Sequence, residues 1–130
     1  MTTTAPLTVT HCTDLYDRYT TAASTVDPDE RRDLLAACAS PDIEILSPFP
    51  YAVRGLDAVA AKLGEVASAM PDGALVIRRS GPIDAHNHVF RVPFENRSGG
   101  QVLSTGLHVV EVANGLIARI LVFVPDVHPT

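Results

Sequence analysis

The chain has 130 residues, of which 46% are hydrophobic and 19% are charged, and its formal net charge is −5. This length suits one domain, and this composition is typical of a folded globular protein rather than a disordered one. Because arginine and lysine cluster only in the pairs Arg31-Arg32 and Arg78-Arg79, the charge pattern argues against a nucleic-acid or membrane partner.

The chain divides into three parts: a flexible N-terminal arm over residues 1–12, one domain over 13–124, and a C-terminal tail over 125–130. Residues 1–6 lack the basic and apolar segments of a secretory signal, and no apolar run is long enough to cross a bilayer. Two cysteines, Cys12 and Cys38, are too few for a disulfide framework and are expected as buried free thiols. We therefore expect a cytoplasmic protein.

Three helices are predicted in the first half. Apolar residues at helical spacing from Cys12 to Val26 predict a helix over 13–25. Asp27 followed by Pro28 is a strong helix start and predicts a second helix that ends before Pro41. A short strand over 42–46 ends at the proline-containing segment 47–50, and a third helix follows Gly55 and is closed by residues 71–73.

Beyond residue 73 the pattern becomes typical of strands, predicted over 74–80, 83–95, 101–112 and 116–124. Residues 96–100 and 113–115 are predicted hairpin turns. Helices followed by consecutive hairpins indicate an α+β fold, in which three N-terminal helices pack on a curved, mostly antiparallel sheet shaped like a cone.

The predicted strand 83–95 contains the main functional signal. Its alternate positions place one group of side chains on a single face, comprising His86, His88, Phe90, Val92 and Phe94. His108 lies on the next strand. Apolar side chains beside histidines are typical of a ligand cavity with a group that exchanges protons near neutral pH. We therefore predict that His88 and His108 face one enclosed cavity and that Arg91 faces outward.

These residues allow two other interpretations. His86, His88 and His108 match a three-histidine metal centre in ligand type, but no carboxylate is placed to support them, so no metal and no cofactor is expected. Tyr19 lies on the apolar stripe of the first helix, and its hydroxyl needs a partner, which is either a substrate or His108.

The order of elements resembles the SnoaL-like branch of the nuclear transport factor 2-like superfamily. The residues that carry the resemblance are Asp17-Arg18-Tyr19 in the first helix, the segment 47–55 before the third helix, and the segment 106–117 near the end. This superfamily includes isomerases, polyketide cyclases, epoxide hydrolases and non-catalytic binding proteins, so the resemblance implies a fold and leaves the function open.

Ketosteroid isomerase is the most informative relative. Arg18-Tyr19 looks like its helix-one motif, whose tyrosine donates a hydrogen bond to the substrate oxyanion. The segment 92–95 looks like its pocket strand, and His108 looks to take the place of its second oxyanion donor. Ser47 stands where that enzyme has its aspartate base. A serine hydroxyl cannot shuttle a proton as a carboxylate does, so the resemblance implies a similar cavity with different chemistry.

The resulting hypothesis is a cofactor-free isomerase or cyclase acting on a hydrophobic carbonyl compound that is polyketide- or steroid-like. Tyr19 and His108 would stabilise an enolate-like oxygen, and His88 or His108 would move the proton. The predicted substrate contacts are Ser47, Phe49, Tyr51, Phe90, Val92, Phe94 and Phe123, with Tyr51 in a flexible loop at the mouth. The resemblance also implies a homodimer formed through the outer face of the sheet.

Two other functions stay open. The loss of the carboxylate base at Ser47 favours a binding protein that holds a hydrophobic ligand without converting it. An epoxide hydrolase would need an Asp-Arg-Asp set on the cavity wall, and only Asp42, Arg91 and Asp84 are available for it.

Overall fold

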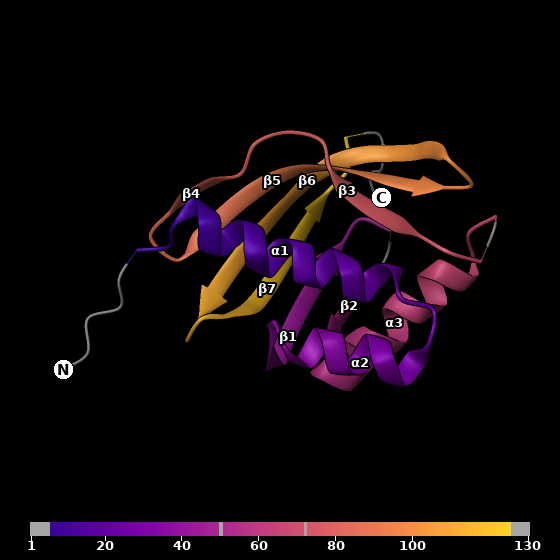
Figure 1. Cartoon of the computed structure of the whole chain (residues 1–130), viewed down its shortest axis with the longest axis horizontal. Coiled ribbons are helices and arrows are strands. Elements are labelled where there is room, and N and C mark those ends of the chain that lie inside the picture. The colour runs from indigo at the N-terminus through magenta and orange to yellow at the C-terminus, as the bar shows by residue number, and fades with distance from the viewer. Residues whose placement is uncertain (1–5, 50, 72, 126–130) are drawn as a thin grey trace.

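The computed structural model describes residues 6–49, 51–71 and 73–125. Three helices pack against one face of a curved, seven-stranded sheet (Figure 1). The predicted α+β fold is confirmed. Parts of four predicted segments lie outside the described residues: the start of the arm (1–5), Pro50, Asp72, and the tail beyond residue 125.

The helices are α1 (Val9–Ser24), α2 (Pro28–Ala36) and α3 (Leu56–Ser68). Helix α1 begins four residues earlier than predicted, so part of the predicted arm is helical. The reason is a helix cap: the side chain of Thr8 accepts a hydrogen bond from the backbone N–H of His11 at 3.1 Å. The predicted cap of α2 is confirmed, since Asp27 accepts from the N–H of Glu30 at 2.8 Å.

The strands are β1 (Ala39–Ser47), β2 (Tyr51–Arg54), β3 (Val76–Arg79), β4 (Asp84–His86), β5 (Val89–Ser98), β6 (Gln101–Ala113) and β7 (Leu116–Phe123). Their order in the sheet is β2-β1-β7-β6-β5-β3, and β4 pairs with β5. Strands β1 and β7 run parallel, and the other pairs run antiparallel. The sheet is therefore mostly antiparallel, as predicted.

The predicted strand 83–95 is not continuous. Asn87 adopts a left-handed conformation, with φ of 51°, and the chain turns there between β4 and β5. A turn interrupts the alternation of side chains, so the positions before it no longer share a face with those after it. Phe90, Val92 and Phe94 keep the predicted common face, whereas His86 and His88 lose it.

Two further details of the strands were missed. The segment around Tyr51 was predicted to be a loop, but it forms β2 and pairs with the end of β1. The hairpin between β5 and β6 is tighter than predicted, because Gly99 and Gly100 both have positive φ, at 59° and 76°. Two such residues complete a two-residue turn, which lets both strands extend to its edge.

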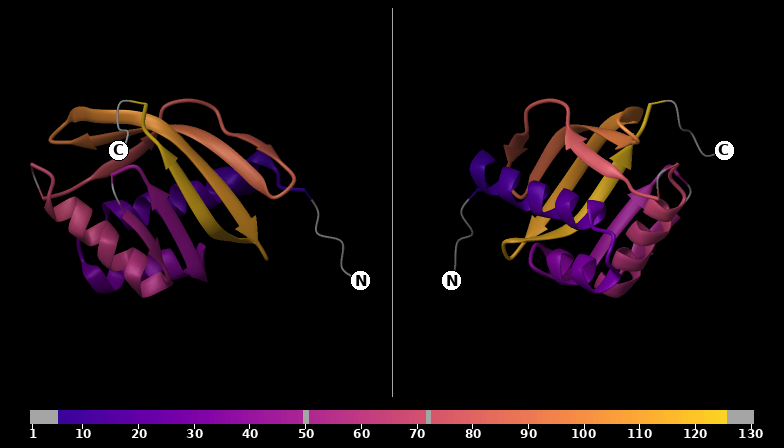
Figure 2. Two further views of the ribbon diagram at one scale, coloured as in Figure 1. Left: turned by 180° about the vertical axis from the view of Figure 1, so that it is seen from behind. Right: turned by 45° about the vertical axis from the view of Figure 1, so that its right-hand side comes forward.

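The core lies between the concave face of the sheet and the helices, which all pack on that side (Figure 2). Phe90, Val92 and Val110 are almost completely buried at its centre. Among the described residues, no helix covers the other face of the sheet. The concave side is therefore the place where a side chain can be both enclosed and accessible to a ligand.

Candidate functional site

A pocket of about 520 Å³ opens between helices α1 and α3 and the concave face of the sheet. Its walls are mainly apolar, contributed by α3, β3, β5, β6 and β7. The lining residues are Tyr19, Phe49, Tyr51, Lys62, Leu63, Glu65, Val66, Ala69, Met70, Leu75, Ile77, Phe94, Asn96, Leu103, Ser104, His108 and Val122. This volume and lining suit a small, largely hydrophobic ligand.

His108 is the polar group at the inner end of this pocket. It is only 3% exposed, and its Nδ1 lies 2.8 Å from the hydroxyl oxygen of Tyr16. Tyr16 is fully buried on α1. Because a buried O–H without an acceptor is costly, and Nδ1 is the acceptor that the structure offers it, we assign Tyr16 as the donor. The proton of His108 then resides on Nε2.

Burial keeps His108 neutral at physiological pH. The loss of hydration lowers the pKa of its imidazole to about 3 from an ordinary value of 6.5. Burial also raises the pKa of Tyr16 and of Tyr19 above that of a free phenol, so both remain protonated. The site therefore presents neutral hydrogen-bond donors, and His108 is not a group that exchanges protons near pH 7.

Tyr19 lies beside His108, with ring centroids 6.3 Å apart and planes at 84°. Among the described residues, neither its hydroxyl nor Nε2 of His108 has a hydrogen-bond partner, and neither atom is sealed from the pocket. The described part of the pocket thus contains two donors without a partner, one from each residue, and its other walls are mainly apolar. Such a pair is suited to a carbonyl oxygen or an oxyanion.

The orientation of His108 is held by stacking as well as by Tyr16. The ring of Phe94 lies parallel to the imidazole at a centroid distance of 3.8 Å and an angle of 4°. Gly106, the cross-strand partner of Phe94, leaves room for this ring: a Cβ there would meet the Phe94 ring and the carbonyl oxygen of Phe123. The stacking of Phe94 on His108 therefore requires a glycine at position 106.

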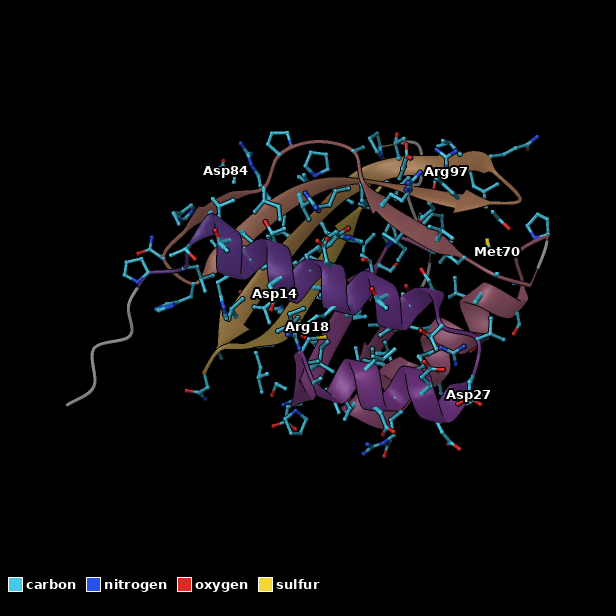
Figure 3. All side chains as sticks on the ribbon, in the orientation of Figure 1. Asp14, Arg18, Asp27, Met70, Asp84 and Arg97 are labelled. Carbon is cyan, nitrogen blue, oxygen red and sulfur yellow. The ribbon has the colours of Figure 1, made fainter. Side chains whose placement is uncertain are left out.

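The mouth of the pocket is more polar. Nζ of Lys62 lies 3.0 Å from the carboxylate of Glu65 and 5.4 Å from the centroid of the Tyr51 ring. Met70, which lies just beyond α3 (Figure 3), also lines the pocket. Burial raises the pKa of Tyr51, an effect that Ser47 and Lys62 partly oppose. Glu65 is the pocket's only carboxylate among the described residues, and it is exposed.

The predicted contact residues separate into three groups. Tyr19, His108, Phe49, Tyr51 and Phe94 line the pocket. Phe90 and Val92 face the same side of the sheet but are buried in the core at 1% and 0% exposure, so they support the pocket without lining it.

The other two predicted contacts do not line the pocket. Phe123 is 53% exposed and pairs with Leu107, whose side chain faces away from His108, so it lies on the outer face of the sheet. Ser47 is occupied in its own turn, where its hydroxyl accepts from the N–H of Phe49 at 3.2 Å.

The predicted shared cavity of His88 and His108 is wrong. His88 is exposed in the turn after β4, and it lines a separate hollow with His11 and Thr8 at the beginning of α1. His86 is also exposed and contacts the side chain of Asn87 at 2.9 Å. The three histidines are therefore not brought together, and no group of three potential metal ligands forms within the described residues.

The Asp-Arg-Asp set is not assembled in the pocket either. Arg91 faces outward as predicted and forms an exposed ion pair with Asp84 at 3.2 Å. Asp42 is exposed on β1. None of the three lines the pocket, so these residues cannot open an epoxide bound there.

Tyr16 is the residue that sequence reasoning missed as a site component. It belongs to the same apolar stripe of α1 as Tyr19, a position typical of a core residue. Its hydroxyl was the available signal: a tyrosine at the centre of a buried stripe needs a polar partner. His108 is the buried polar group that can meet this need.

A family model described as the SnoaL-like domain matches residues 16–120. The chain belongs to the SnoaL-like family. Its fold is that of the nuclear transport factor 2-like superfamily. No curated protein matches the chain. The matched segment begins at Tyr16 and includes Tyr19 and His108.

Solved structures of low sequence identity share this fold. A proposed isomerase of the SnoaL-like family from Agrobacterium tumefaciens is 20% identical, with 90% of this chain and 99% of that chain covered at a TM-score of 0.81. A proposed SnoaL-like polyketide cyclase from Jannaschia sp. is 14% identical, with 96% and 92% covered and a TM-score of 0.72.

A proposed ketosteroid isomerase from Kribbella flavida is 16% identical, with 93% of this chain and 82% of that chain covered at a TM-score of 0.68. At sequence identities this low, the similarity to these structures shows a shared fold. None of the helices in the described part of the chain is long and apolar enough to span a membrane.

Proposed function

We propose that this protein binds a hydrophobic carbonyl compound in the pocket and acts on it as a cofactor-free isomerase or cyclase. The observation that carries the proposal is the buried bond between Tyr16 and Nδ1 of His108 at 2.8 Å. It leaves Nε2–H of the histidine free to donate to a ligand in the pocket, which Tyr19 also lines. The carbonyl oxygen of the ligand would accept both hydrogen bonds.

These donors would act by stabilising negative charge. When a proton leaves the carbon next to a carbonyl group, the electron pair moves to the oxygen and forms an enolate. Fixed donors in a poorly hydrated pocket stabilise that oxygen more than they stabilise the neutral carbonyl, so they lower the barrier. Returning the proton to another carbon completes an isomerisation, whereas attack of the enolate carbon on a second carbonyl closes a ring.

The proton acceptor in this scheme is not a histidine. His108 has a pKa of about 3 and its Nδ1 is occupied by Tyr16, while His88 lies in a different hollow. Among the described residues of the pocket, the group with a carboxylate is Glu65 at the mouth. We assign proton removal to Glu65 acting through a water molecule in the pocket, because the carboxylate lies at the mouth and the carbonyl group of the ligand at the inner end.

Proton exchange provides a direct test. β-Tetralone is a hydrophobic ketone with acidic protons next to its carbonyl group, and their replacement by deuterium in D₂O can be followed by NMR. We expect the wild-type protein to accelerate the exchange, and Tyr19→Phe to reduce the acceleration roughly 100-fold or more, as is usual for the loss of one oxyanion donor. Phe123→Leu, on the outer face, is the control and should exchange at the wild-type rate.

A non-catalytic binding protein is the second candidate. It is favoured by the lack of an enclosed carboxylate in the described part of the pocket. If β-tetralone binds to the wild-type protein, and Tyr19→Phe weakens this binding, but the exchange rate equals that of buffer, the binding function is the better account. Failure of both binding and exchange would refute the proposed pocket chemistry.

We further propose that the protein is a cytoplasmic homodimer. Both cysteines are free thiols, which is typical of a reducing compartment. The outer face of the sheet carries incompletely buried apolar side chains, namely Leu46, Leu107, Val109, Leu121 and Phe123. Light scattering should give the mass of two chains, and Leu121→Asp should shift it towards one.

A further inference from the structure

We propose that Asn96 and Ser104 form a second polar subsite at the opposite end of the pocket from His108. This subsite would bind an oxygen substituent at the far end of an elongated, rigid, hydrophobic ligand. The inference rests on the proposed function, which places the ligand's carbonyl oxygen at His108 and Tyr19, and it adds the length and the second functional group of that ligand.

The register of β5 and β6 sets the distance between the two ends. Asn96 pairs with Ser104, Phe94 with Gly106, and Val92 with His108, so these residues form successive rows on one face of the sheet. His108 lies four positions after Ser104 on β6. At about 3.3 Å per residue, their Cα atoms are roughly 13 Å apart along the strand. Both side chains line the same pocket, so one molecule can contact both.

A β-bulge shapes this outer end. Asn96 pairs with Ser104 and Arg97 with Val102, so Leu103 is an extra residue in β6. Neighbouring residues of a regular strand face opposite sides, but Leu103 and Ser104 both line the pocket. The bulge therefore redirects Leu103. Its side chain, 44% exposed, provides an apolar contact beside the polar pair and limits the length of the ligand.

The pair has hydrogen-bonding capacity left over. Nδ2 of Asn96 donates to Oγ of Ser104 at 3.0 Å. Among the described residues, the hydroxyl proton of Ser104 and the amide oxygen of Asn96 have no partner, and neither group is sealed off. The pair therefore offers at least one donor and one acceptor to a ligand. Lys62, the cation at the mouth, is already engaged with Glu65 and with the Tyr51 ring.

The wall between the two polar ends is apolar. It consists of Phe94 and Val122 from the sheet, Leu75 and Ile77 around β3, and Val66 from α3. A flexible chain would lose conformational entropy in this space, so a rigid body is favoured. The inferred ligand class is thus a fused-ring or biaryl compound with a carbonyl or enol oxygen at one end and a hydroxyl or keto group at the other.

Two matched probes test this inference. para-Phenylphenol has one hydroxyl group, and para,para′-biphenol has a second one at the other end of the same rigid body. Titration calorimetry would measure both Kd values for the wild-type protein, Ser104→Ala and His108→Ala. Thr105→Ala is the matched control, because Thr105 is the next residue on β6 and is exposed on the outer face. Circular dichroism would verify that each variant is folded.

The biphenol can bind in two equivalent orientations, which alone gives a twofold gain in affinity. After correction for this gain, we expect the wild-type protein and Thr105→Ala to bind the biphenol roughly fivefold more tightly than the monophenol. Ser104→Ala should remove this preference and leave the monophenol unchanged. Equal binding of the two probes by the wild type, or a preference that survives in Ser104→Ala, would overturn the second subsite.

The outcome for His108→Ala separates this inference from the proposed function. If His108→Ala weakens both probes while the biphenol has no advantage, the proposed function stands and only the second subsite fails. If His108→Ala weakens neither probe, His108 does not bind the ligand at the inner end of the pocket. The proposed function then fails, and so does the orientation assigned to the ligand.

Discussion

Two histidines of this chain, His108 and His88, show how strongly position determines what a residue can do. His108 is 3% exposed, receives a hydrogen bond from Tyr16 and stacks on Phe94. His88 is exposed in the turn between β4 and β5 and lines a separate hollow at the beginning of α1. The two looked similar in the sequence. Enclosure turns His108 into a neutral donor with a fixed orientation, and nothing comparable acts on His88.

Truncating each histidine should give the largest contrast. His108→Ala leaves the Tyr16 hydroxyl without its partner and creates a cavity beside Phe94, so we expect a loss of about 2–4 kcal/mol in the free energy of unfolding. His88→Ala removes an exposed side chain and should change it by less than about 0.5 kcal/mol. Urea denaturation of both variants measures the difference. Equal losses would contradict the assigned environments.

The stability of the protein should also depend on pH through His108. Its folded pKa of about 3 lies below the ordinary value of 6.5, so between these values the unfolded chain binds a proton that the folded chain does not. Stability is then lost as the pH falls through this window, by up to roughly 1.4 kcal/mol per pH unit from this group. Urea denaturation between pH 4 and 7 should show this slope in wild type and His88→Ala. The slope should be much smaller in His108→Asn, and a slope that persists there would assign it to another group.

Replacing the hydroxyl partner tests the donor assignment more finely. Tyr16→Phe keeps the ring packing but leaves Nδ1 of His108 without its hydrogen bond, which should cost about 1–2 kcal/mol of stability. It also releases the constraint on which ring nitrogen is protonated. Tyr19→Phe is the matched control, because the Tyr19 hydroxyl has no partner among the described residues. It should leave stability nearly unchanged and weaken phenol binding. A larger stability loss for Tyr19→Phe than for Tyr16→Phe would reverse the two roles.

The sequence predicted the fold because most of its signals are local. The cap at Asp27, the turn at Asn114-Gly115 and the alternation of Phe90, Val92 and Phe94 each depend on neighbouring residues, and each was read correctly. The order of the elements then indicated the cone. The strand β2 was missed although its partner β1 is close in the chain, because this short strand is stabilised by pairing with β1 rather than by a pattern in its own residues.

The site was only partly predictable for the same reason. His108, Tyr19, Phe49, Tyr51 and Phe94 were expected in the pocket and line it. The bond between Tyr16 and His108 joins residues 92 positions apart, and no local pattern shows which tyrosine of a helix reaches a given strand. The misplacement of His88 has a single cause.

That cause is Asn87. The alternation of residues 84–95 favours one strand, but asparagine tolerates the left-handed conformation better than most residues do. Its φ of 51° ends β4 and separates two histidines that strand geometry would have aligned with Phe90.

The smallest expected effect comes from this turn itself. Glycine adopts a positive φ without strain but loses more conformational entropy on folding, so Asn87→Gly should change stability by less than about 0.5 kcal/mol. The Leu7 N–H donates to the backbone carbonyl of Asn87, and the substitution preserves that bond. Because the turn does not line the pocket of His108, para-phenylphenol should bind the variant with the wild-type Kd.

Asn87→Val disfavours the left-handed conformation, so the free energy of unfolding should fall by about 1–2 kcal/mol. The folded variant should still bind the phenol with the wild-type Kd. A changed Kd in either variant would show that the turn and the pocket are coupled, and would weaken the contrast between the two histidines.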